Sequence, residues 1–193
     1  MVRGLTSVQS FFLPARPVHY PDPTMLNITI RNEQPEDIAT IAWVTKTAFA
    51  SERFTSHTEQ FIINALRQSN RLTISLVALY EGTIVGHIAF SPVKISSGEQ
   101  GWYGLGPVSV LPQWQGQGIG IQLIRSGLAQ LQQLGGRGCV VLGDPDFYSR
   151  FGFKVSSFLL YADAPAEYFQ AMAFVGEVPS GQVSFHEAFE ATQ

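Results

Sequence analysis

The sequence is poor in cysteine. Cys139 is the only cysteine among 193 residues, so no disulfide can form within the chain, and the usual thiolate clusters that hold metal ions are excluded. It stands in the uniformly apolar run Cys-Val-Val-Leu, which predicts a small buried core residue rather than a nucleophile. A lone thiol suits a reducing compartment, and we expect a cytoplasmic protein.

Charge and long hydrophobic runs are scarce as well. Charged residues make up 14% of the chain, and 12 Lys+Arg against 15 Asp+Glu leave a formal charge of −3. This balance provides no basic surplus for a nucleic-acid groove. No apolar run approaches the roughly 18–20 residues that cross a bilayer, so we expect no membrane segment.

What the chain does have is enough apolar material for one core. Hydrophobic residues make up 45% of the sequence, and we predict a single domain over residues 25–193. Residues 1–24 lack the long apolar stretch of a secretory signal, and prolines crowd their second half. They are therefore predicted to be an extended or flexible leader.

Strands are predicted first from apolar and polar alternation and from β-branched residues. Three such runs are residues 26–30, 73–80 and 83–90. The last two are separated by Glu81-Gly82, which predicts an antiparallel hairpin. Residues 102–110 are a further strand candidate, but Gly104, Gly106 and Pro107 disfavour regular pairing. We expect this strand to be bulged or partly unpaired, with free backbone groups.

Helical spacing predicts three longer helices and one short one. The longer helices run from Pro35 to about Phe49, from the capping box Ser56-His57-Thr58-Glu59 to about Ser69, and from Gly118 to Gly135-Gly136. The third has the apolar stripe Ile121, Ile124, Leu128 and Leu131, which we interpret as core. Asp144-Pro145 has the form of a cap and first residue of a short helix that ends at Gly152.

The last part of the chain is predicted to return to strands. Residues 139–142 are short and uniformly apolar, as is typical of a parallel strand buried on both faces after a crossover helix. Residues 153–161 are predicted as one more strand beside it. Residues 169–174 and 182–185 are expected to form terminal strands.

One stretch, residues 108–121, combines a strand, a glycine-rich turn and a helix start. The first amides of a helix have no intrahelical partner, and the helix dipole is positive at that end. Glycines at positions 116, 118 and 120 let the backbone approach an oxygen closely. The stretch therefore predicts an anion site, most simply for phosphate.

Three segments together resemble the GCN5-related N-acetyltransferases (GNAT), in particular their YhbS-like members. These segments are Leu-Gly-Pro-Val-Ser-Val-Leu-Pro at 105–112, Gln-Gly-Gln-Gly-Ile-Gly at 115–120 and Leu-Gly-Asp-Pro-Asp-Phe-Tyr-Ser-Arg-Phe-Gly-Phe at 142–153. Gln115, Gly118 and Gly120 match the family pattern Q/R-x-x-G-x-G/A. Tyr148 with Gly152-Phe153 matches the tyrosine-bearing helix of the family and the Gly-Phe that follows it.

The resemblance implies an α+β fold and a cofactor. The sheet would be central and mostly antiparallel, flanked by helices, with a V-shaped split between its fourth and fifth strands that holds acetyl-CoA. Backbone groups around Val108, Ser109 and Val110 would bind the pantetheine arm. The pyrophosphate would be bound by amides of Gln115, Gly116, Gln117, Gly118, Ile119 and Gly120. Both glutamines are neutral where relatives often have Arg or Lys, so the amides and the helix dipole would neutralise the phosphates.

The resemblance also assigns chemistry, the transfer of acetyl to a primary amine. Tyr148 would donate a proton to the departing CoA sulfur; the alternative is a tyrosine that only packs against its helix. Asp144 would touch the pantetheine arm, or would serve only as the helix cap. Removing the amine proton would need a base, and the sequence offers Glu52, His57, His87 and His186, with a water chain or a backbone carbonyl as alternatives.

Two other functions remain open. A nucleotide or dinucleotide enzyme would use the same turn, but G-x-G-x-x-G would need glycine where Ile121 and Leu123 stand, and no G-K-[S/T] is present. A non-catalytic acyl-CoA sensor on the same fold is the second. We expect the acceptor to be a small-molecule or peptide amine, and the sequence leaves monomer and homodimer open.

Overall fold

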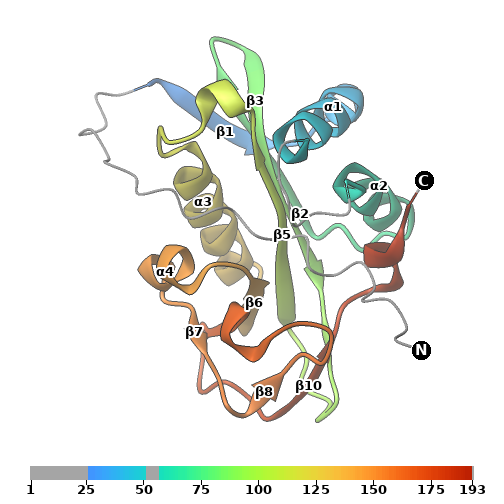
Figure 1. Cartoon of the computed structure of the whole chain (residues 1–193), viewed down its shortest axis with the longest axis vertical. Helices are drawn as coiled ribbons and strands as arrows, with labels where there is room; N and C mark the ends of the chain where they lie inside the picture. Colours follow the sequence, from blue (N-terminus) through green and yellow to red (C-terminus); the bar gives the residue numbers. More distant parts are fainter. Residues whose placement is uncertain (1–25, 51–56, 193) are drawn as a thin grey trace.

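The computed structural model describes residues 26–50 and 57–192, so the predicted leader, residues 1–24, lies outside the described residues. Seven strands form the main sheet in the order β1-β2-β3-β5-β6-β9-β7, and β4, β10 and β8 form a small second sheet. Helices α1 and α2 cover one face of the main sheet, and α3 and α4 lie on the other (Figure 1). In the main sheet only β5 and β6 pair in parallel, so the predicted mixed α+β class with a mostly antiparallel sheet is confirmed.

The strands are β1 (Ile28–Asn32), β2 (Ile74–Tyr80), β3 (Thr83–Pro92), β4 (Lys94–Ile95), β5 (Trp102–Val110), β6 (Gly138–Leu142), β7 (Lys154–Val155), β8 (Leu159–Leu160), β9 (Phe169–Ala173) and β10 (Gly181–Ser184). The α-helices are α1 (Ile38–Phe49), α2 (Glu59–Gln68), α3 (Ile119–Gln133) and α4 (Pro145–Tyr148). Short 3-10 turns are η1 (Pro35–Asp37), η2 (Pro112–Trp114), η3 (Ser149–Phe151), η4 (Ala166–Tyr168) and η5 (Glu187–Glu190). No helix in the described part of the chain has the length and apolarity needed to cross a membrane.

The first half follows the predicted order closely. β2 and β3 form the antiparallel hairpin, and its two turn residues, Glu81 and Gly82, have φ of 48° and 82°. Both values are left-handed, as the favoured two-residue hairpin turn requires. The first strand was predicted two residues too early, since it begins at Ile28.

The start of α2 was predicted too early. The capping box placed it after Ser56, which lies outside the described residues, whereas the helix begins at Glu59 with Thr58 as its N-cap. The reason lies in His57, whose φ of 58° is left-handed and cannot belong to a right-handed helix. α3 begins and ends as predicted, but Ile121 of its predicted stripe is only half-buried, and Leu123 is fully buried instead.

The prediction for residues 153–161 was wrong. This stretch forms two short strands, β7 and β8, and neither is a neighbour of β6. The Ser156 hydroxyl accepts hydrogen bonds from the amides of Phe158 and Leu159, both at 3.2 Å, which bends the chain out of an extended strand. β9 takes the place beside β6 and pairs with it over residues 138–142, while β7 pairs with the outer edge of β9. The terminal strands were predicted correctly as β9 and β10.

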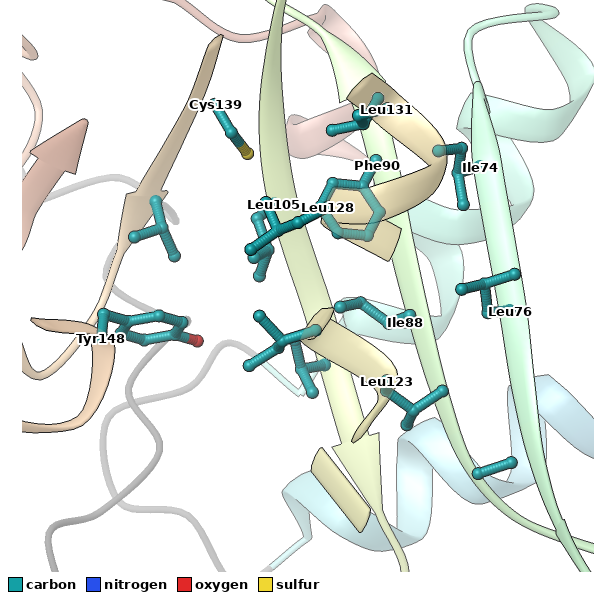
Figure 2. Packing of buried hydrophobic residues seen from close by; sticks show 14 of the residues in the cluster. Ile74, Leu76, Ile88, Phe90, Leu105, Leu123, Leu128, Leu131, Cys139 and Tyr148 are labelled. Carbon is teal, nitrogen blue, oxygen red and sulfur yellow. The ribbon is translucent and has the colours of Figure 1, made fainter. Parts of the chain in front are cut away.

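The largest core cluster lies between α3 and the main sheet (Figure 2). Leu123, Leu128 and Leu131 of α3 pack there against buried side chains of β2, β3 and β5. Cys139 is fully buried in this cluster, and burial raises the pKa of its thiol, so the prediction of a core cysteine is confirmed.

Candidate active site

The site begins where β5 loses one neighbour. β5 pairs with β6 only from Trp102 to Leu105, opposite Gly138 to Val141. Beyond Leu105 it keeps β3 on one edge and has no strand on the other. The register against β3 shifts there by one residue, at the Gly106-Pro107 dipeptide. This is the predicted disrupted strand, and it produces the predicted V between β5 and β6.

The open edge presents particular backbone groups. The amide of Leu111 donates to the carbonyl of Val85 at 2.9 Å, and bonded and non-bonded pairs alternate along an antiparallel ladder. The backbone groups of Ser109 therefore face β3, whereas those of Val108 and Val110 face the open edge. Of the three predicted strand residues, Val108 and Val110 can offer backbone groups to a ligand.

The glycine turn follows directly on the same strand. Gly116 and Gly118 have φ of 76° and 78°, and Gly118 is the N-cap of α3. A Cβ atom at either position would meet nothing within 4 Å, so their backbone conformation, not crowding, requires glycine. α3 has no acidic residue in its first turn. Its first amides, at Ile119 and Gly120 among others, are thus left to bind an anion.

The two glutamines of the turn are engaged with the backbone. Gln115 donates its side-chain amide to the carbonyl of Val110 at 3.0 Å, and Gln117 donates to the carbonyl of Gln113 at 3.1 Å. Gln115 thereby ties the turn to the open edge of β5. Their side chains shape the turn and bring no charge to it.

Tyr148 ends α4 and faces the split. Its side chain is 2% exposed and lies among Phe147, Phe151 and Phe153, with ring centroids 5.0–6.3 Å away. Its hydroxyl points from the β6 side toward β5 (Figure 2). A Cβ atom on Gly143 would lie 2.2 Å from the Tyr148 ring, so glycine there makes room for the side chain. Burial raises the pKa of Tyr148, and its hydroxyl is therefore held in the proton-donating form.

Asp144 caps the helix that bears Tyr148. Its carboxylate accepts a hydrogen bond from the amide of Asp146 at 2.9 Å. The predicted helix start is confirmed. A contact with the pantetheine arm stays a prediction.

The four candidate bases differ in position and in burial. Glu52 lies outside the described residues. His186 accepts a hydrogen bond from the amide of Ala188 at 3.1 Å and so caps η5. His87 is 0% exposed, and burial lowers its pKa to about 3. His57 is exposed just before α2.

Buried polar groups under α1 were not predicted. The hydroxyls of Thr45 and Ser109 lie 3.2 Å apart, and Ser75 lies 2.7 Å from the imidazole of His87. All four side chains are at least nine-tenths buried. Strand alternation places Ser75 on a definite face, but only the register between strands reveals which residues meet.

Comparison with known proteins finds matches to acetyltransferases of the GNAT family. The model of the acetyltransferase (GNAT) domain matches residues 71–155. A GNAT-family acetyltransferase of Brucella melitensis, solved in complex with acetyl-CoA, is 50% identical; the match covers 86% of this chain and 99% of that one, with a TM-score of 0.76. The N-acetyltransferase YhbS of Escherichia coli, solved with CoA, is 33% identical over 91% of this chain and 98% of that one, with a TM-score of 0.79.

In a comparison by sequence alone, this chain matches YhbS of Escherichia coli strain K12, which is described as an uncharacterized N-acetyltransferase. It is 39% identical over 111 residues, which is 57% of this chain and 66% of that protein, so this match spans slightly less than two thirds of the relative. The structural matches cover nearly all of the two solved relatives, and the fold agrees with theirs. The chain belongs to the GNAT family of acetyltransferases.

Proposed function

We propose that this chain is an acetyl-CoA-dependent N-acetyltransferase that passes the acetyl group directly to a primary amine. The observation that carries the proposal is a convergence on one edge of β5. The backbone groups of Val108, the amide of Val110, the turn that begins α3 and the hydroxyl of Tyr148 all face the split. A relative that is 50% identical binds acetyl-CoA.

The residues of the split fit the cofactor. The pantetheine arm has peptide-like amides, which can pair with the open edge of β5 as a further strand would. The amides at the start of α3 can bind the pyrophosphate, with the helix dipole in place of a basic side chain. When bound, acetyl-CoA supplies an acyl group activated as a thioester.

Tyr148 suits the role of proton donor. A departing thiolate of pKa about 8.5 can take a proton from a phenol whose ordinary pKa is about 10. Tyr148 is protonated at neutral pH and can donate to sulfur as charge develops there, while burial, which raises its pKa, makes it a weaker acid than a free phenol. A positioned acid of this kind contributes about 10²- to 10⁴-fold in rate.

The amine must lose a proton as well. A lysine-like amine with a pKa of about 10.4 is neutral in only about one molecule in a few thousand at pH 7. Of the candidate bases among the described residues, His57 is the one at the surface beside the start of α2, and it is the side-chain candidate for this step, with a water chain or a backbone carbonyl as the alternatives.

The test measures acetyl-CoA binding by calorimetry and CoA release with a panel of polyamines, amino acids, antibiotics and peptides. The parent should bind acetyl-CoA and release CoA with at least one amine, and mass spectrometry should detect the acetylated product. Tyr148→Phe should bind acetyl-CoA about as well and release CoA about 100-fold more slowly.

Two outcomes would contradict the proposal. Thermal stabilisation by NADH or ATP without stabilisation by acetyl-CoA would indicate a nucleotide enzyme. Binding of acetyl-CoA with no CoA release from any amine, in parent and variant alike, would indicate a sensor.

A further inference from the structure

The backbone of Gly143 is held by a side chain at the point where the β6–β9 ladder ends. The last pair of that ladder is Leu142 opposite Phe169, and Gly143 is the next residue along the chain. Its amide donates to the carbonyl of Tyr168 at 3.0 Å, and its carbonyl accepts from Nε2 of Gln170 at 3.1 Å. Both backbone groups of Gly143 are therefore attached to β9 and to the turn that precedes it.

The side chain of Gln170 takes the place of a backbone donor. A bonded pair in an antiparallel ladder exchanges two hydrogen bonds, so the amide of Tyr168 would ordinarily return a bond to the carbonyl of Gly143. This amide donates instead to the carbonyl of Pro165 at 3.1 Å, in the turn η4. Gly143 is buried, and a buried carbonyl without a partner is costly. Nε2 of Gln170 supplies the partner that the ladder does not.

Gln170 is buried on the face of the sheet that carries Tyr148. It is 1% exposed and lies opposite Val141 in the β6–β9 ladder, so these two side chains share one face. Val141 and Tyr148 belong to the same core cluster. A glutamine amide is neutral, so it can donate at this depth without the cost of burying a charge.

Gly143 in turn borders the ring of Tyr148. A Cβ atom on Gly143 would lie 2.2 Å from that ring, so ring and backbone are in close contact. The helix that ends at Tyr148, α4, has four residues, far fewer than a helix needs to be stable alone. The place of Tyr148 therefore depends on the segment that leads into α4, and Gly143 is where this segment leaves the sheet.

We propose that Gln170 is a positioning residue for acetyl transfer, which fixes the carbonyl of Gly143 and so holds the hydroxyl of Tyr148 toward β5 (Figure 2). Gln170 acts through Gly143 and the ring packed against it. The inference rests on the proposed role of Tyr148 as proton donor. It concerns the β6 side of the split, so the amides at the start of α3 should bind the pyrophosphate as before.

The first test separates rate from affinity in Gln170→Met. Methionine keeps the length of the side chain and removes its donor. CoA release per folded molecule should slow about 10- to 100-fold, because a catalytic group displaced by about 1 Å can lose about 100-fold in rate. Acetyl-CoA affinity, measured by calorimetry, should stay within about threefold of the parent. A rate within about twofold of the parent would refute the role.

The second test repeats the substitution in the Tyr148→Phe background. A positioning residue has no hydroxyl left to place there, so adding Gln170→Met should change the rate of Tyr148→Phe by less than about twofold. A general structural defect would slow both backgrounds by the same factor, and that result would overturn the proposal. Gln170→Asn keeps the amide but shortens the reach by one methylene, and should behave as Gln170→Met does. This second variant keeps the test independent of how well either one folds.

A third measurement needs no activity. Carbon-13 NMR of labelled tyrosine, with Tyr148→Phe identifying the signal, should show that the Tyr148 ring signal shifts in Gln170→Met. The matched control is Gln100→Met, because Gln100 also donates to a glycine carbonyl, that of Gly98, at 3.1 Å, but in an exposed turn. It should keep both the signal and the rate of the parent. An unmoved signal in Gln170→Met would contradict the inference.

Failure of Gln170 to act is distinguishable from failure of the proposed function. A parent protein that releases no CoA with any amine would refute acetyl transfer itself. A parent that is active, with Gln170→Met equally active, would refute only the positioning role of Gln170.

Discussion

The two halves of β5 differ in what covers their edges. From Trp102 to Leu105 the strand has β3 on one side and β6 on the other. From Gly106 to Val110 it has β3 alone, and its second edge faces the split. In the closed half the backbone hydrogen bonds hold the sheet together. In the open half the same kind of group is free for a ligand.

The difference indicates that the closed half of β5 mainly stabilises the fold, whereas the open half is available to a ligand. Residues of the closed half lie under the aromatic side chains of the C-terminal region, and Phe185 packs directly over Gly104. The open half is bordered by an exposed glycine turn and by Tyr148. Changes beside the open half should therefore alter binding and catalysis, while matched changes elsewhere should alter only stability.

The largest effect is expected for Gly143→Ala. The added methyl would lie 2.2 Å from the Tyr148 ring, so the ring must move, and displacing a catalytic group by about 1 Å can cost about 100-fold in rate. Acetyl transfer should fall by that amount, measured as CoA release. Gly127→Ala is the control, because its methyl would lie 2.1 Å from the Phe90 ring in the core. Its overpacking should reduce the free energy of unfolding by about 1–3 kcal/mol, seen as a lower melting temperature, and leave the rate per folded molecule unchanged.

The next effect is expected for Gly118→Ala. Its φ of 78° disfavours an alanine by about 1–2 kcal/mol, so the turn should relax and binding must restore its shape. Acetyl-CoA should bind about 5- to 30-fold more weakly in calorimetry. Gly82→Ala has the same kind of backbone, with φ of 82°, and equally open space, but lies in the hairpin. An equal loss of affinity in Gly82→Ala would break the contrast between the two regions.

The third effect concerns pH and the buried imidazole of His87. Burial lowers the pKa of His87 to about 3, whereas an unfolded histidine has a pKa of about 6.5. Between these values the unfolded state binds more protons, so the free energy of unfolding rises with pH. Stability should be fully present above about pH 6.5 and fall as the pH decreases toward 3. Urea unfolding of His87→Gln should lose the part of this slope between about pH 6.5 and 4.5; an unchanged slope would exclude His87 as its source.

The smallest effect is expected for Gln115→Ala. It removes the hydrogen bond to the Val110 carbonyl that ties the turn to the open edge. A single such bond is worth about 0.5–1.5 kcal/mol, so acetyl-CoA affinity should fall about two- to tenfold. Gln100→Ala removes a similar bond, to the carbonyl of Gly98 at 3.1 Å, in a distant exposed turn. It should leave the affinity unchanged.

Local chemistry made much of this architecture predictable. Two positive-φ positions at Glu81-Gly82, the apolar stripe of α3 and the cap at Asp144 each depend on neighbours in sequence, and each was predicted correctly apart from Ile121. Gly104, Gly106 and Pro107 also predicted correctly that β5 would lose part of its pairing. The family followed from the motifs at 115–120 and 142–153, and the comparisons confirm it.

The errors in the late strands share a physical cause. A two-residue strand has too few hydrogen bonds to be specified by its own sequence, so β7 and β8 depend on the partners that the rest of the fold offers. The place of β9 beside β6 could not be deduced either, because pairing between distant segments is decided by tertiary packing.

By itself the sequence determined where the glycine-rich turn precedes a helix and which strand is interrupted, because glycine and proline act on their own φ angles. Only the tertiary structure decided which side chains meet. Tyr148 faces β5 because β6 diverges from it, and His87 lies opposite Ser109 because of the register between two strands. Such contacts join residues far apart in the chain, so they exist only once the sheet has formed.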